Sequence, residues 1–217
     1  MAKRNTRELI LETSLALFNS LGEPNVTTNH IADETDISPG NLYYHFNNKQ
    51  DIVLELFKRF AMQLEPILDV PTEVSLHAED LWFQLHLSFE LKGHYRFLYR
   101  NLADITAESR DLERAFKGLF LREKQATESL LSNLESTGAL KIEKVEKDLL
   151  LNNLMLAQIY WISFAELFDT GGLDQGDVQV KAIAGVLQMV MPYLRTRERK
   201  EFASLSAAYL SHSGPLA

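Results

Sequence analysis

The apolar residues of this 217-residue chain recur three or four positions apart, which is the period of an α-helix. The first apolar stripe runs from Ile10 through Phe18 to Leu21, and Gly22 ends it. No segment alternates convincingly between apolar and polar residues, as a half-buried strand does. The pattern therefore predicts an all-α protein.

Capping residues and prolines mark where the following helices begin and end. Thr27 or Thr28 can cap a short helix, and Ser38-Pro39 combines a capping hydroxyl with a proline at the first helical position. Pro66 and Pro71 are expected to end the fourth helix. The predicted ranges are Thr28 to Thr35, Pro39 to His45, Lys49 to Leu64, Ser75 to Lys92, Tyr95 to Ile105, Ser109 to Thr137, Val145 to Phe168, Val178 to Leu194 and Glu201 to Leu210.

Length and composition limit the class of protein. A chain that is 46% hydrophobic at this length allows one full core and a small additional module. It contains no cysteine, which excludes disulfides and thiolate zinc sites. The N-terminus has no apolar signal segment, and no apolar run approaches the roughly 20 residues of a membrane helix. We expect a cytoplasmic protein with one large and one small domain and no membrane partner.

The net charge of −8 argues against nucleic acid as a partner, because affinity for DNA comes largely from Lys and Arg. The charge is not uniform, however. Residues 37–50 contain no carboxylate, while Lys3, Arg4 and Arg7 lie together near the N-terminus. The acidic average therefore does not exclude a DNA-binding surface.

Residues 27–49 carry the clearest functional pattern, two short helices joined by a tight turn. Five apolar residues are spaced to form one small core between them: Ile31, Ala32, Ile37, Leu42 and Phe46. The rest of the second helix offers hydrogen-bonding groups suited to a major groove: Ser38, Gly40, Asn41, Tyr43, Tyr44 and His45. The alternative is a structural hairpin whose tyrosines pack on the larger domain.

The complete motif reads Ile31-Ala32, then Ile37-Ser38-Pro39-Gly40-Asn41-Leu42-Tyr43-Tyr44-His45-Phe46, then Lys49. It resembles the signature of TetR-type repressors, and the match is close over about residues 6–52. Thr35 and Asp36 depart from the usual Ala and Gly, but Asp adopts a left-handed turn at modest cost. The resemblance implies a three-helix helix-turn-helix DNA-binding domain over residues 1–50 and a helical effector-binding and dimerisation domain over residues 51–217.

The resemblance also implies which residues meet double-stranded DNA. Phosphate contacts fall on Thr28 and Ser38, base contacts on Gly40, Asn41 and Tyr44, and contacts to phosphate or a thymine methyl on Tyr43 and His45; Lys49 is a further contact, and Thr27 and Pro39 complete the set. Exposed N–H groups where the short helices begin can also meet phosphates, which needs little positive charge. Lys3 and Arg4 either reach a minor groove or form a disordered tail.

Two later helices, Val145 to Phe168 and Val178 to Leu194, carry more apolar surface than one stripe requires. The second of them is apolar on two sides through Val180, Ile183, Val186, Leu187, Val190 and Met191. We therefore expect a homodimer formed mainly by these helices, and a palindromic operator.

The large domain is also expected to bind a small-molecule effector of unknown identity. The candidate lining residues are Trp82, Phe83, His86, Phe89, Phe116, Phe120 and Trp161, although most aromatics of this domain are ordinary core. Bases outnumber acids between Lys92 and Lys124, which suggests either an anionic effector or a solvated face of helix pairs such as Glu113 with Lys117.

Two other classes of protein remain open. A helical interaction module would use the tyrosine-rich helix on a protein partner. A metal-dependent enzyme would use His86, Glu90 and His94, but Gly93 interrupts the helix, and Lys92 and Arg96 would repel a cation. No phosphate loop or nucleophile motif is present, so we expect no enzyme, no metal and no cofactor.

Overall fold

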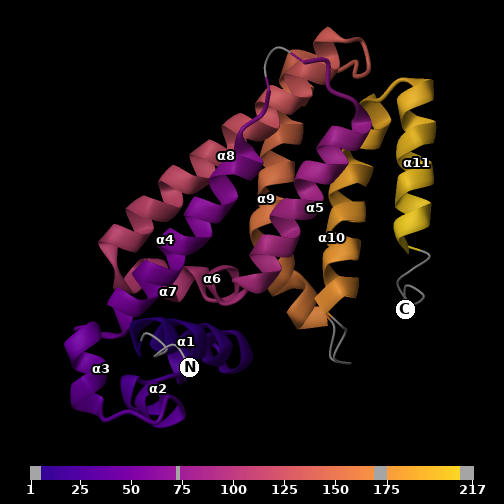
Figure 1. Cartoon of the computed structure of the whole chain (residues 1–217). Coiled ribbons are helices and arrows are strands. Elements are labelled where there is room, and N and C mark those ends of the chain that lie inside the picture. The colour runs from indigo at the N-terminus through magenta and orange to yellow at the C-terminus, as the bar shows by residue number, and fades with distance from the viewer. Residues whose placement is uncertain (1–5, 72–73, 169–174, 211–217) are drawn as a thin grey trace. The chain divides into compact units, whose positions relative to one another are not determined.

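We describe residues 6–71, 74–168 and 175–210 of a computed structural model (Figure 1). These ranges contain helices and one isolated bridge between Leu140 and Leu194, so the all-α prediction is confirmed. Two short 3-10 helices are η1 (Glu23–Asn25) and η2 (Met191–Tyr193). The α-helices are α1 (Thr6–Leu21), α2 (Thr28–Glu34), α3 (Pro39–His45), α4 (Lys49–Leu68), α5 (Ala78–His94), α6 (Phe97–Arg100), α7 (Leu102–Glu108), α8 (Arg110–Ser136), α9 (Lys144–Phe168), α10 (Gln175–Val190) and α11 (Thr196–Leu210).

The chain forms two compact units. The first unit comprises residues 1–63 and 95–117, and the second comprises residues 64–94 and 118–217. Helices α4 and α8 each contribute residues to both units. Within the described residues, no helix is long and apolar enough to cross a membrane.

The first unit contains the predicted pair of short helices. The Thr27 side chain accepts a hydrogen bond from the His30 N–H at 3.1 Å, and Ser38 Oγ accepts one from the Asn41 N–H at 3.2 Å. Each hydroxyl satisfies a backbone donor in the first turn of its helix, which is why both helices begin at these residues. The inner side chains of this pair, Ile31 and Leu42, are fully buried.

The turn between α2 and α3 accommodates both departures from the motif. Asp36 adopts a left-handed conformation with φ of 53°. Thr35 is buried, and its hydroxyl donates to the Ile31 carbonyl oxygen at 2.7 Å, so its extra polar atom is satisfied. The turn therefore keeps the two helices at a fixed angle without a glycine.

Several predicted helix bounds are wrong. The helix predicted over Ser75 to Lys92 runs from Ala78 to His94 and is not interrupted at Gly93, the helix predicted over Val178 to Leu194 runs from Gln175 to Val190, and the last helix begins at Thr196 rather than Glu201. Helix α4 continues past Pro66 to Leu68. Pro66 removes one N–H from the helix, but Met62, whose carbonyl loses that partner, is 72% exposed and lies where water can replace it. The single helix predicted over residues 95–105 is instead divided into α6 and α7 at Asn101, whose backbone leaves the helical region.

The second unit is built around α10, which packs against α5, α9 and α11 (Figure 1). Its core includes Leu85 and Phe89 from α5, Leu154 from α9 and Phe202 from α11. Gly185 allows α10 to approach α9 closely, because a Cβ atom there would lie only 3.2 Å from Trp161 Cζ3. The backbone of residues 139–141 also bonds to that of residues 193–195, which joins the end of α8 to the segment before α11.

Candidate DNA-binding surface

The outer face of α3 is open to solvent. Tyr44 is 85% exposed and Tyr43 is 49% exposed, while Ser38, Gly40 and Asn41 are also exposed. Only Leu42 and the residue after the helix, Phe46, are buried beneath this face. Within the first unit, therefore, neither tyrosine packs as a core residue.

Helix α2 positions part of the surface through a side-chain contact. Thr28 Oγ1 and Tyr43 Oη lie 3.1 Å apart and share a hydrogen bond. The ring of His45 meets the ring of Tyr44 edge-on, with centroids 5.2 Å apart. Tyr44 is the more exposed of the two tyrosines on this face.

Lys49 is placed differently from the other predicted contacts. Its Nζ forms an ion pair with Glu23 Oε1 at 2.8 Å and donates to the Glu23 carbonyl oxygen at 3.0 Å. The Glu23 side chain is 1% exposed, and that of Lys49 is 17% exposed. Lys49 therefore joins the start of α4 to η1 and is engaged by protein groups rather than directed to solvent.

Two asparagine side chains form hydrogen bonds to the backbone in the same region. Asn101 Oδ1 accepts a hydrogen bond from the Glu23 N–H at 3.1 Å, and Asn19 Oδ1 accepts one from the Phe97 N–H at 3.1 Å. These contacts fix the end of α1 against α6 and α7. Sequence analysis missed Asn19, Glu23 and Asn101, since no motif links residues that lie 78 positions apart.

Two arginines of this unit form further internal pairs. Arg7 contacts Glu55 at 3.2 Å, and its guanidinium lies 4.9 Å from the centroid of the Phe46 ring. Arg59 donates to both carboxylate oxygens of Glu8, and this hydrogen bonding holds the pKa of Glu8 below its usual value. These pairs join α1 to α4. Lys3 and Arg4 lie outside the described residues.

The predicted effector-binding residues lie in different environments. Trp82 stacks on His86, and both are half-buried on α5, where Phe89 is core and Phe83 is 56% exposed. On α8, Phe120 is half-buried. Phe116 is buried in the first unit, with its ring centroid 4.5 Å from that of Phe57.

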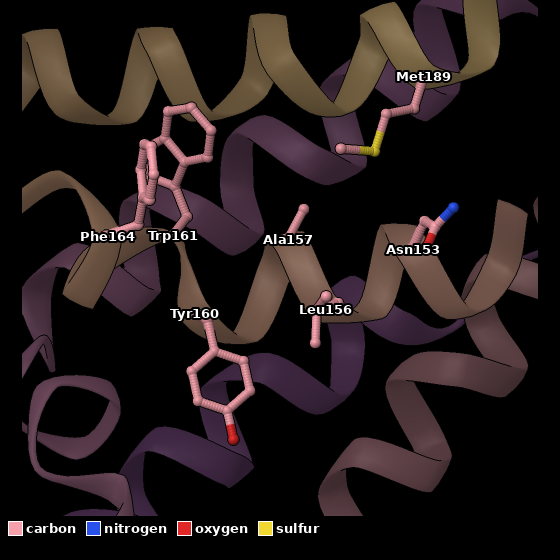
Figure 2. A pocket seen from close by; sticks show the side chains of 7 residues that line it. All are labelled: Asn153, Leu156, Ala157, Tyr160, Trp161, Phe164 and Met189. Atoms are coloured by element: carbon pink, nitrogen blue, oxygen red, sulfur yellow. The ribbon is translucent and has the colours of Figure 1, made fainter.

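Trp161 lines an open apolar groove between α9 and α10, with a volume of about 370 Å³. Figure 2 shows Trp161 and Phe164 directed toward α10, and Met189 directed back toward α9. The remaining lining residues are Asn153, Leu156, Ala157 and Tyr160. The groove is almost entirely apolar, and Trp161 is the one candidate effector-binding residue among those that line it.

A short exposed helix that packs on the preceding short helix across a tight turn is the arrangement of a helix-turn-helix DNA-binding protein. The family model of bacterial regulatory proteins of the TetR family matches residues 10–56, and the TetR model, described as a bacterial transcriptional repressor, matches residues 59–202. The chain belongs to the TetR family of bacterial transcriptional repressors. Members of this family are DNA-binding regulators and not enzymes.

Individual relatives agree with this assignment. A crystal structure of a TetR-family transcriptional regulator from Marinobacter aquaeolei VT8 is 32% identical, with a TM-score of 0.87 over 94% of this chain and 98% of that chain. The SmeT–triclosan complex shares the fold at 20% identity, with a TM-score of 0.60 over 88% of this chain and 92% of that one.

A curated relative, the "Probable acrEF/envCD operon repressor" of Escherichia coli (strain K12), is 36% identical over 63 residues. That match spans 26% of this chain and 29% of the relative.

The Lys49–Glu23 pair yields a stability prediction. Lys49→Met leaves the buried Glu23 carboxylate without its ion partner and should lower the free energy of unfolding by about 3 kcal/mol. Replacing both residues with Met should cost much less, because no buried charge then remains. Urea titration measures both, with Lys58→Met, an exposed lysine of α4, as the matched control.

A phosphate contact by Lys49, the role expected from the sequence, predicts different changes in stability and in DNA binding. If Lys49 met a phosphate, Lys49→Met would match Lys58→Met in stability and would lower the salt slope of DNA binding by about one. That result would refute the role of Lys49 in joining the start of α4 to η1.

Proposed function

We propose that the protein is a dimeric repressor that reads a palindromic operator through α3 and is released from it by a small-molecule effector. The observation that carries the proposal is the exposed face of α3, with Asn41 and Tyr44 uncovered above a buried Leu42. Repression requires contact with bacterial DNA, so we place its action in the cytoplasm.

The α3 face separates into groups that read bases and groups that position the helix. Gly40 lets the start of α3 approach the floor of a major groove, while Asn41 and Tyr44 reach base edges from the exposed side. Thr27, Thr28, Ser38, Pro39, Tyr43 and His45 surround them and supply phosphate and thymine contacts. We assign Lys49 a positioning role instead, because Glu23 engages its ammonium group.

The dimer interface is proposed on α9, with a smaller contribution from α10. Exposed apolar residues form a long stripe on α9: Val145, Leu149, Leu156, Tyr160, Phe164 and Leu167, each at least 52% exposed. On α10, by contrast, Ile183, Val186 and Leu187 are buried within the chain, and Met189 at 37% contributes the exposed surface. A second copy that covers this stripe and the α9–α10 groove would remove both apolar surfaces from water.

Effector release requires a route from the second unit to α3. Helix α4 begins beside α3 at Lys49 and continues into the second unit, so a ligand that shifts the far end of α4 also moves the DNA-reading end. SmeT, which shares the fold, was solved in complex with triclosan. This supports a ligand-responsive second unit here.

Base-reading residues should differ from positioning residues in their effect on specificity. Asn41→Ala or Tyr44→Ala should weaken operator binding by roughly 1–3 kcal/mol and random DNA binding much less. Fluorescence anisotropy with both duplexes measures the difference. Phe83→Ala, an exposed aromatic on α5, is the matched control and should change neither affinity. Equal loss on both duplexes would rule out base reading by the substituted residue.

The proposed interface predicts that a charge on the α9 stripe disrupts the dimer. Phe164→Glu should convert the protein to a monomer in sedimentation velocity and sharply weaken operator binding, because a buried carboxylate would have no partner. Leu121→Glu places the same charge at a 62% exposed leucine of α8 and should leave the dimer intact. If the Phe164→Glu variant remained a dimer, the interface would have to lie on another surface.

Release by an effector predicts reciprocal coupling. For a ligand of the second unit, saturating operator should weaken ligand binding by the same factor, about 5- to 150-fold, by which the ligand weakens operator binding. Calorimetry measures the affinity for the ligand with and without operator, and anisotropy measures the affinity for the operator with and without ligand. Random duplex is the control. A ligand that binds tightly while neither affinity changes would contradict release by that ligand.

A further inference from the structure

The second unit contains a fully buried ion pair between α5 and α8. Lys92 Nζ lies 3.0 Å from Glu123 Oε1, and the two side chains are 0% and 2% exposed. Transfer of two such ions from water is costly, and their mutual attraction offsets that cost only when further hydrogen bonds satisfy the remaining lone pairs. The surroundings of Glu123 therefore decide whether the pair is complete.

The Glu123 carboxylate is incompletely satisfied. Among the residues that the structure describes, none donates a hydrogen bond to Glu123 Oε2. Thr127, one turn further along α8, directs its hydroxyl to the Glu123 carbonyl oxygen at 3.0 Å and so does not serve the carboxylate. A carboxylate accepts several hydrogen bonds, so a strong acceptor remains available at this position.

An aromatic core residue lies next to the pair. The Phe89 ring centroid lies 5.6 Å from Lys92 Nζ, and Phe89 itself belongs to the core of the unit. A second buried polar atom, Gln158 Nε2 on α9, also has no hydrogen-bond partner in the described part of the chain. Buried polar atoms with unused hydrogen-bonding capacity therefore occur in this unit, and the one on Glu123 adjoins an ion pair next to an aromatic core residue, a combination found in small-molecule sites.

Some of the basic residues between Lys92 and Lys124 form ion pairs on exposed surface, so their number alone does not require an anionic ligand. Lys117 pairs with Glu113 and Arg122 with Glu65, as expected of a solvated helix face. The Lys92–Glu123 pair is neutral as a whole. An anion or a cation placed beside it would leave one uncompensated buried charge, whereas a neutral molecule would not.

We propose that the Lys92–Glu123 pair is the polar end of a binding site for a neutral, largely apolar molecule that carries a hydroxyl group. A hydroxyl donates one hydrogen bond and accepts others, so it can donate to Glu123 Oε2 and accept from Lys92 Nζ at once. The apolar remainder of the ligand lies among side chains such as Phe89. The inference rests on the proposed function, since it identifies the class of effector that the second unit takes.

The test compares four probes that differ only in their polar end: para-hexylphenol, its methyl ether, para-hexylbenzoate and para-hexylbenzylamine. Isothermal titration calorimetry with the full-length protein in the absence of DNA measures each affinity. The phenol should bind roughly 10- to 100-fold more tightly than the ether, as expected for a hydrogen bond to a charged group. Both ionic probes should bind more weakly than the phenol.

Two double variants connect this preference to the pair. Lys92→Met with Glu123→Leu replaces the ions by apolar groups of similar size, which buried pairs often tolerate without loss of stability. This variant should bind the phenol and the ether with nearly equal affinity. Lys147→Met with Glu135→Leu removes a more exposed pair, with 17% and 44% exposed side chains, and should keep the preference of the unaltered protein.

Three results would overturn the inference. These are failure of the phenol to bind up to its solubility limit, a preference for an ionic probe, and a phenol preference that survives loss of the pair. The first would mean that internal water alone satisfies Glu123. Failure of the proposed function is distinct, because it appears as absent operator binding or absent coupling while the phenol preference remains measurable without DNA.

Discussion

The DNA-reading surface depends on the burial of Leu42 against α2. Helix α3 has seven residues, too few for a helix to be stable alone in water. Its position is set instead by apolar contacts with Ile31 and Ala32, by the Ser38 cap and by the left-handed turn at Asp36. Because Leu42 faces inward, Asn41 and Tyr44 must face outward, and the same contact that stabilises the helix exposes its reading face.

Much of this part of the fold could be predicted from the sequence because its signals are local. Capping hydroxyls, a proline at the first helical position and helical spacing of apolar residues place the starts of α2 and α3 correctly. The same local reasoning failed at Pro66, where the exposed side of α4 tolerates a lost hydrogen bond. It also failed at Asn101, where the helix divides and the side chain accepts a hydrogen bond from the distant Glu23 N–H.

Long-range partners explain what sequence reasoning missed at the candidate sites. The role of Lys49 depends on Glu23, which lies 26 positions earlier, and a motif match supplied no information about that pairing. The candidate effector residues were chosen as aromatics, yet Phe116 belongs to the other unit and Phe83 is exposed. The buried Lys92–Glu123 pair was hidden because the sequence does not show which charged residues face inward.

The most direct test of the central claim is selection of bound DNA. Purified full-length protein is incubated with a pool of random-sequence duplexes, and the retained DNA is sequenced after repeated rounds. The account predicts that retained duplexes share an inverted repeat, with half-site centres about one helical turn or slightly more apart, roughly 10 base pairs. Retained DNA without a common sequence, or with a single unrepeated site, would contradict a dimer that reads bases through α3.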